Sequence, residues 1–328
     1  MLMKTKVYLV VLAFSFTFLM LGCSGIVIAG IENISPQLSA TPSDTATTTA
    51  TPFLAITNTP IVIPPTYTLT PTYTPSATDT PVPTDTPTPT DTPIPTETPA
   101  LEWNPAGHVT APILLYHHVS DEGYGNRYYV TIDDFRAQME ALRDWGYATI
   151  TPSDLIDVLI NGGEIPNRPV IISFDDGNID VYKNAFPIMH EMGFVGAFYI
   201  VANRLQSNAY VNPDQLQELI DDGWEIGSHS MSHVDLTLDY SVVRFEMLQS
   251  RLTLQEASGE SIDTYAYAYG KTDGFITGKV SDYGYRAAMG LGSSWEHTMG
   301  TLFYLSRIEV QGDYSLSTFA VKLPWSDH

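Results

Sequence analysis

The chain has 328 residues and carries a net charge of −22 at pH 7. Nucleic acids and anionic lipids attract basic proteins, so this acidic balance argues against both as partners, whereas it suits a neutral or cationic substrate. An acidic exterior that only keeps the protein soluble would explain the charge equally well. The single cysteine, Cys23, excludes an internal disulfide framework.

Residues 1–31 are typical of a signal peptide or a membrane anchor. Lys4 and Lys6 precede the apolar run VYLVVLAFSFTFLML, as in secretory signals. The following MLGC resembles the lipobox of bacterial lipoproteins, which favours a lipid on Cys23. The alternative is an uncleaved anchor, because residues 7–31 are long enough to span a bilayer. Both interpretations place the rest of the chain outside the cytoplasm, tethered to a membrane.

Residues 32–105 are dominated by threonine and proline and contain few apolar side chains. Such a composition cannot build a core and predicts a disordered linker. Proline favours an extended conformation of about 3.1 Å per residue, so this linker would reach roughly 200 Å if fully stretched. A spacer of that length suits a domain that is held away from its membrane.

Strand and helix patterns alternate through residues 106–328, which have the length and composition of one globular domain. Strands are predicted at 111–117, 147–150, 169–174, 194–201, 224–228, 264–269 and 285–290. Helices are predicted at 131–146, 151–163, 181–193, 212–223, 241–257 and 274–282. This alternation predicts a parallel sheet in a closed or nearly closed (β/α) barrel; an open doubly wound sheet is the alternative.

Four predicted strands end in polar side chains. The clusters that follow them are His117-His118, Asp175-Asp176-Gly177, His229-Ser230-Met231-Ser232-His233 and Tyr269-Gly270-Lys271. The C-terminal ends of barrel strands face a common mouth, so these clusters are expected to meet there. Aromatic side chains on which sugar rings can stack also surround this predicted mouth: Tyr116, Tyr124, Tyr128, Tyr129, Tyr210 and Trp295.

The adjacent acids Asp175 and Asp176 end an apolar strand, where two carboxylates oppose each other's ionisation unless a positive group lies nearby. His229 and His233 are four residues apart and would share one face of a helical turn. Two imidazoles and one carboxylate form a facial triad for a divalent metal, with zinc the first choice. One acid would then bind the ion, and the other would act as a base toward water.

These motifs resemble the polysaccharide deacetylase family, which has the chitooligosaccharide-deacetylase homology domain. ISFDDG resembles the family's T-F-D-D-G motif, and HSMSH resembles H-[ST]-x-x-H. PILLYHHVSDE, GWEIGSHSMSHVDL and YAYAYGK resemble the subgroup that includes poly-N-acetylglucosamine deacetylases. The resemblance extends from about Pro112 to Val310. It implies a distorted (β/α)7 barrel and metal-dependent removal of acetyl groups from N-acetylated sugars.

The resemblance also implies residue roles. Asp175 resembles the catalytic base, and Asp176, His229 and His233 resemble the metal ligands. The backbone N–H of Tyr269 corresponds to the tyrosine of the family's R-x-P-Y motif and would stabilise an oxyanion.

The chain departs from the family pattern in three places. Ala266 and Ala268 stand where R-x-P-Y has arginine and proline, and the late Leu-x-His motif is absent. Arg307 is the candidate to replace the arginine, with a surface salt bridge as the alternative. His117 is the preferred donor of a proton to the leaving amine, with a structural histidine as the alternative, and His297 is a weaker candidate in a Gly/Ser-rich loop.

The sequence therefore predicts a membrane-tethered, extracytoplasmic zinc hydrolase that deacetylates an N-acetylhexosamine polysaccharide. A glycan-binding module with a decayed site is one alternative, favoured by the three departures. An O-acetyl esterase on a wall polysaccharide is another, because it would use the same machinery.

Overall fold

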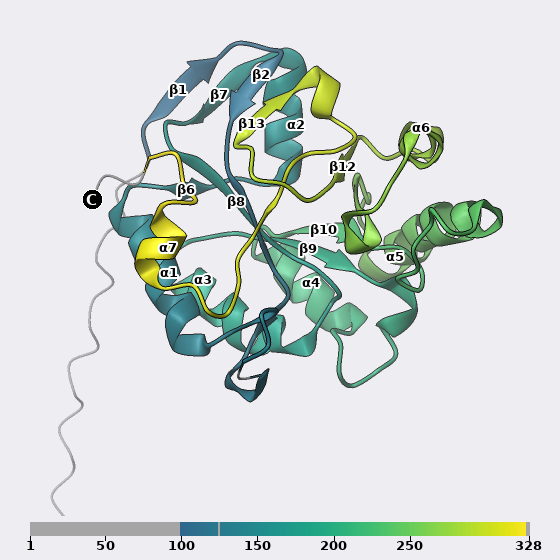
Figure 1. Cartoon of the computed structure of the whole chain (residues 1–328), viewed down its shortest axis with the longest axis horizontal. Helices are drawn as coiled ribbons and strands as arrows, with labels where there is room; N and C mark the ends of the chain where they lie inside the picture. Colours follow the sequence, from purple (N-terminus) through teal and green to yellow (C-terminus); the bar gives the residue numbers. More distant parts are fainter. Residues whose placement is uncertain (1–98, 124, 326–328) are drawn as a thin grey trace, which may run out of the picture. The chain divides into compact units, whose positions relative to one another are not determined.

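The computed structural model describes residues 99–123 and 125–325 (Figure 1). The predicted signal or anchor, Cys23 and almost all of the predicted linker lie outside these residues. Within the described residues, no helix has both the length and the apolar character needed to cross a membrane.

Parallel strands form the centre of the domain. Seven of them are hydrogen-bonded in the order β12-β11-β10-β9-β8-β3-β14, and an eighth, β6, also pairs with β8. The bounds are β3 (Ile113–Tyr116), β6 (Ala148–Thr149), β8 (Pro169–Phe174), β9 (Ala197–Ile200), β10 (Glu225–Ser228), β11 (Thr264–Ala266), β12 (Ala287–Met289) and β14 (Ile308–Glu309). All six residues of β8 are buried, as its uninterrupted apolar sequence predicts for a central parallel strand.

The segment 302–309 joins the two edges of the curled sheet. Ala288 in β12 donates to the carbonyl of Leu302 and accepts from Leu305 N–H, at 3.1 and 2.8 Å. Farther along the same segment, β14 pairs with β3 through Ile308 opposite Leu114. The sheet is therefore a distorted barrel, as predicted, and not the open doubly wound alternative.

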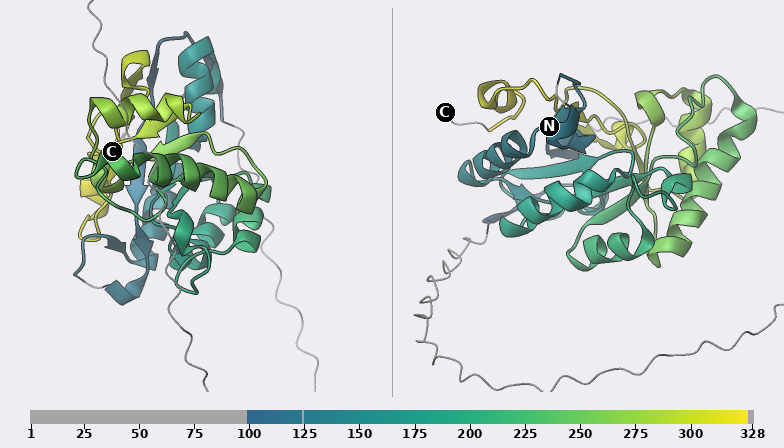
Figure 2. Two further views of the ribbon diagram at one scale, coloured as in Figure 1. Left: turned by 90° about the vertical axis from the view of Figure 1, so that its right-hand side faces the viewer. Right: turned by 90° about the horizontal axis from the view of Figure 1, so that it is seen from below.

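Helices surround this sheet, as Figures 1 and 2 show. Their bounds are α1 (Ile132–Asp144), α2 (Pro152–Asn161), α3 (Phe186–Glu191), α4 (Pro213–Asp221), α5 (Ser250–Ser258), α6 (Gly274–Asp282) and α7 (Leu316–Ala320). Sequence signals mark several of their starts. Thr131 caps α1 by accepting from Asp134 N–H, and Thr151 and Asp154 form a reciprocal capping box before α2.

Two predicted helices are interrupted by wider π-helical turns. The helix predicted at 181–193 consists of η2 (Val181–Ala185) followed by α3, and Phe186 N–H bonds to the carbonyl of Val181. Pro187 lacks an N–H for the regular ladder, which accounts for the wider turn. The helix predicted at 241–257 consists of the 3₁₀ turn η4 (Tyr240–Val242), the π turn η5 (Arg244–Gln249) and α5.

Three short pairs of strands lie outside the barrel path and were not predicted. They are β1 (Leu101–Asn104) with β7 (Gly163–Pro166), β2 (His108–Thr110) with β13 (Glu296–Thr298), and β4 (His118–Val119) with β5 (Tyr129–Val130). The remaining 3₁₀ turns are η1 (Asp121–Gly123), η3 (Ala202–Arg204), η6 (Ala268–Gly270) and η7 (Met299–Thr301). The strand predicted at 264–269 ends at Ala266, and the turn η6 follows from Ala268, with Tyr269 in a left-handed conformation.

Candidate active site

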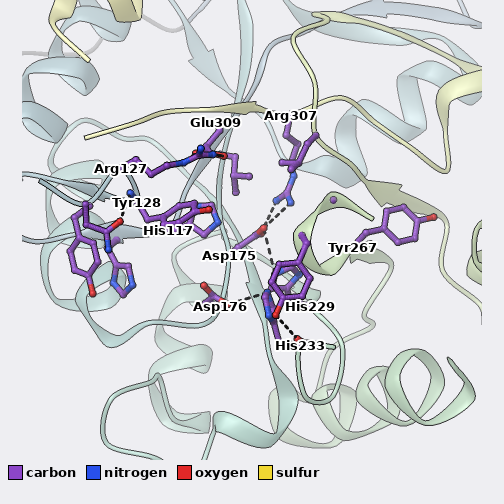
Figure 3. Close-up of a pocket in the computed structure, with 17 residues that line it drawn as sticks. His117, Arg127, Tyr128, Asp175, Asp176, His229, His233, Tyr267, Arg307 and Glu309 are labelled. Atoms are coloured by element: carbon purple, nitrogen blue, oxygen red, sulfur yellow. Dashed lines mark hydrogen bonds and ion pairs between the residues drawn. The ribbon is translucent and has the colours of Figure 1, made fainter. Parts of the chain in front are cut away.

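A cavity of about 480 Å³ opens where β3, β8 and β10 end (Figure 3). Its lining includes seven of the side chains for which the sequence predicts a site role: His117, Asp175, Asp176, His229, His233, Tyr269 and Arg307. The predicted convergence of the strand-end clusters on one mouth is therefore confirmed.

Asp176, His229 and His233 form a compact set of possible metal ligands. One donor atom from each lies within 4.8 Å of the others. His233 Nε2 is 3.6 Å from Asp176 Oδ1, and the two imidazole rings meet edge to face with centroids 4.7 Å apart. Side chains from the ends of β8 and β10 thus surround one point.

Left-handed backbone conformations aim these ligands. Asp176 has φ 75° and is followed by Gly177 at φ 81°, while Ser230 and His233 have φ 69° and 62°. Residues 229–233 are not helical, so the condition under which His229 and His233 would share one face through their spacing is not met. Two left-handed residues bring the imidazoles together instead, in a conformation that only glycine adopts at little cost.

The hydrogen bonds of the histidines fit a metal centre. His229 Nδ1 lies 2.9 Å from the carbonyl of Ala266, an arrangement in which Nδ1 carries the proton and Nε2 keeps its lone pair. Burial, followed by the neighbouring His229, lowers the pKa of His233 to about 4, so this imidazole is neutral at neutral pH. Two imidazoles and a carboxylate are a donor set suited to zinc and other first-row divalent ions.

Arg307 binds Asp175 through two parallel hydrogen bonds. Its Nη1 and Nη2 each lie 2.7 Å from one oxygen of the carboxylate (Figure 3). Asp175 is 3% exposed and Arg307 is 1% exposed, so the alternative of a surface salt bridge is wrong. Burial raises the pKa of Asp175, but Arg307, with His229, outweighs it and holds this pKa well below its usual range.

His117 lies in the same cavity, beside Tyr128, with ring centroids 4.8 Å apart. Its Nδ1 is buried and has no hydrogen-bond partner among the described residues. Burial lowers the pKa of His117, and the nearby Asp175 and Asp176 oppose that shift. The structure thus brings His117 to the predicted place, whereas its role as proton donor stays a prediction.

Tyr269 lies at the rim of the cavity with 57% of its surface exposed and φ 60°. Its ring meets that of His233 edge to face at 4.6 Å, and its hydroxyl donates to the carbonyl of His233 at 3.3 Å. These contacts place the side chain of Tyr269 beside His233, whereas the role of its backbone N–H stays a prediction.

His297 is not in the cavity. It lies in strand β13 and not in the expected loop, and its Nε2 is 3.0 Å from the carbonyl of Ala111. It is therefore a buried structural histidine. Of the six aromatic residues expected near the mouth, Tyr128 and Tyr129 line the cavity, and Tyr124 lies outside the described residues.

Sequence reasoning missed three charged residues at this site. Arg204 Nη1 lies 3.1 Å from Asp176 Oδ1, and Arg127 forms a paired contact with Glu309 on the cavity wall. These residues lie in no motif, and each contact joins separate parts of the chain, so neither pattern nor spacing could reveal them.

Comparisons with known proteins agree with this geometry. Residues 162–288 match the profile of the family described as polysaccharide deacetylase. The Bacillus subtilis protein YxkH, classed with the polysaccharide deacetylases, is 26% identical over 209 residues, which cover 63% of this chain and 74% of YxkH. A poly-beta-1,6-N-acetyl-D-glucosamine N-deacetylase of Staphylococcus epidermidis is 28% identical over 109 residues, or 31% of this chain and 37% of that protein.

The fold is shared with solved deacetylase structures. The Streptococcus pyogenes deacetylase PplD, solved in complex with acetate, matches with a TM-score of 0.60 and 23% identity, covering 66% of this chain and 98% of PplD. The described domain is therefore similar in sequence and in fold to polysaccharide deacetylases, and residues 162–288 carry the match to that family.

Proposed function

We propose that this chain is a metal-dependent hydrolase that removes acetyl groups from an N-acetylhexosamine polysaccharide outside the cytoplasm. One observation carries the proposal: a possible metal-ligand set, Asp176, His229 and His233, shares a cavity with a buried carboxylate that is held in one orientation by Arg307. The departure of Ala266 from the family's arginine favours a decayed site only if nothing replaces that arginine. Arg307 binds both oxygens of Asp175 and can thus orient this carboxylate in place of that arginine, which supports an intact site.

Asp176, His229 and His233 are the residues that would hold the ion, with zinc first among the candidates. When bound, a divalent ion supplies Lewis acidity that polarises a carbonyl and lowers the pKa of water. The described residues contribute the remaining chemistry.

Asp175 is the proposed base. Arg307 uses one lone pair of each carboxylate oxygen, and each oxygen keeps a second one for a proton from the attacking water. The paired contacts fix the plane of the carboxylate, so the proton acceptor needs no reorganisation when water attacks. The same contacts lower the basicity of Asp175, which makes orientation the larger contribution of Arg307.

Tyr269 and His117 are proposed for the two remaining tasks. The N–H of Tyr269 would donate to the oxygen that becomes negative as the acetamide carbonyl is attacked. His117 would deliver a proton to the departing amine, since it lines the cavity together with Asp175 and Asp176.

Sequence similarity and the N-terminal residues support the proposed substrate and location. The relative from Staphylococcus epidermidis acts on poly-beta-1,6-N-acetyl-D-glucosamine, which favours an amino-sugar polymer here as well. The signal-like residues 1–31 and the Thr/Pro-rich segment 32–105 support a surface enzyme tethered to a membrane by lipid or helix.

Acetate release from a panel of acetylated glycans, with zinc and with a chelator, tests the proposal. N-acetylglucosamine oligomers are expected to release acetate only with metal, and Asp175→Asn is expected to lower the rate at least about 100-fold. Binding without acetate release, unaffected by Asp175→Asn, would identify a glycan-binding module. Faster release from O-acetylated xylan than from the amide substrates would identify an esterase.

A further inference from the structure

We propose that Glu246 is a positioning residue that fixes the turn between the two ligand histidines and so sets the metal affinity. This inference rests on the proposed function, because it takes His229 and His233 to be ligands. Glu246 lies on the π turn η5, thirteen residues beyond His233, and no motif includes it.

The carboxylate of Glu246 binds the middle of the turn. Its Oε2 accepts from the N–H groups of Met231 and Ser232 at 3.0 and 2.8 Å, and its Oε1 accepts from Ser232 Oγ at 2.5 Å. Three donors from two adjacent residues thus converge on one carboxylate. The two residues that they hold lie directly between His229 and His233.

The turn needs such a restraint because its backbone is unfavourable. Ser230 and His233, on either side of the held residues, both have positive φ without being glycine. Such conformations persist only where surrounding contacts over-determine them. One bond within the turn, from His233 N–H to Ser230 Oγ at 2.8 Å, supports it locally. From outside, the N–H groups of Ala202 and Asn203 bind the carbonyls of Ser230 and Met231 at 3.1 Å each, and Glu246 supplies the side-chain support.

The burial of Glu246 points the same way. It is 3% exposed, and among the described residues no cationic side chain pairs with it. Burying a carboxylate costs free energy unless hydrogen bonds satisfy it. The three donors therefore stabilise the buried Glu246, and Glu246 in turn holds the donors in place. Glu246 lies on the inward face of its helical segment, together with the buried Val243 and Ser250.

A general contribution to stability is the competing explanation, and Glu225 provides a matched control. It lies at the start of β10, the strand that leads to His229, and it accepts from Ser153 N–H and Thr264 Oγ1 at 2.8 and 3.1 Å. A substitution at Glu225 disturbs the same strand without touching the ligand turn.

The test asks whether zinc affinity depends on the length of the side chain at position 246 or on its charge. Glu246→Gln keeps the length of the side chain and one oxygen for the two N–H donors, whereas Glu246→Asp keeps the charge but is one methylene too short. Zinc affinity is measured on the full chain by competition with a chromophoric chelator, together with the melting temperature of the metal-free protein. Glu225→Gln and Glu225→Asp are measured in parallel.

Glu246→Asp is expected to weaken zinc binding at least about tenfold, the usual effect of removing an outer support of a ligand. Glu246→Gln and both Glu225 variants are expected to stay within about threefold of the unaltered chain. The inference is overturned if Glu246→Asp binds zinc as tightly as the unaltered chain, or if Glu225→Asp loses as much affinity. An unaltered chain that binds no zinc overturns it as well.

Two further arms keep the test decisive. If Glu246→Asp does not fold, Ser232→Ala removes one of the three contacts; a threefold or greater weakening supports the inference, and an unchanged affinity overturns it. The zinc measurement does not depend on acetate release. A chain that binds zinc but releases no acetate refutes the proposed hydrolase, while the zinc affinities still decide the role of Glu246.

Discussion

Replacing Arg307 with methionine is expected to destabilise the metal-free protein by about 3–5 kcal/mol at pH 7, the usual cost of removing one partner from a buried ion pair. The reason is that Asp175, 3% exposed, would keep a buried charge without its two 2.7 Å contacts. Asp175→Asn has the reverse effect, because it leaves the buried charge of Arg307 without its partner. The double variant leaves no buried charge from this pair, so it is expected to recover most of the loss.

Urea unfolding of the four proteins measures this double-mutant cycle, and a coupling of at least about 2 kcal/mol is expected. Arg136→Met is the control, because its contact with Glu191 is exposed and should be worth less than about 1 kcal/mol. If the two single losses simply add in the double variant, or if each is as small as that of the control, then Arg307 and Asp175 do not depend on each other as described.

Three further predictions concern the ligands and the fold. Asp176→Asn is expected to weaken zinc binding at least about tenfold, since it removes a charged ligand; chelator competition measures this, and an unchanged affinity would rule Asp176 out. The metal-free protein is expected to lose stability as the pH falls from about 6.5 to 4, because unfolded His233 takes up a proton in that window while folded His233, with a pKa of about 4, does not. The melting temperature should therefore depend less steeply on pH in His233→Gln than in the unaltered chain. An equal slope in both proteins would show that His233 is not the group that titrates. Thr151→Ala is expected to cost about 1 kcal/mol through loss of the cap of α2 while the rate of acetate release stays unchanged.

Much of the fold was predictable because its signals are local. The apolar run at 169–174 is long enough to identify a buried strand, and Thr151 with Asp154 marks the start of α2 within four residues. Strands such as β14 were missed because a two-residue strand has no periodicity of its own and exists only through its pairing with β3. The local widening at η2 was missed as well, because Pro187 also suits the first turn of a regular helix.

The site was predictable in composition but not in conformation. The residue types and strand-end positions of Asp176, His229 and His233 were sufficient to predict that they meet. The spacing of the histidines suggested a helical turn. Ser230 and His233 instead adopt left-handed conformations, which their residue types do not predict. Contacts between distant residues outside the motifs, such as Arg204 with Asp176, depend on how the strand ends come together, and sequence spacing carries no information on that.

The position of Arg307 within the closing segment 302–309 has a consequence for how the protein is made. A ribosome synthesises Asp175, Asp176, His229 and His233 well before it reaches this segment. Arg307 itself follows Asp175 by 132 positions. Until then Asp175 has no Arg307 to pair with, and the strands β3 and β12 each have an unpaired edge that can bind other chains. A chain truncated before Leu302 would therefore retain every ligand yet be prone to aggregation.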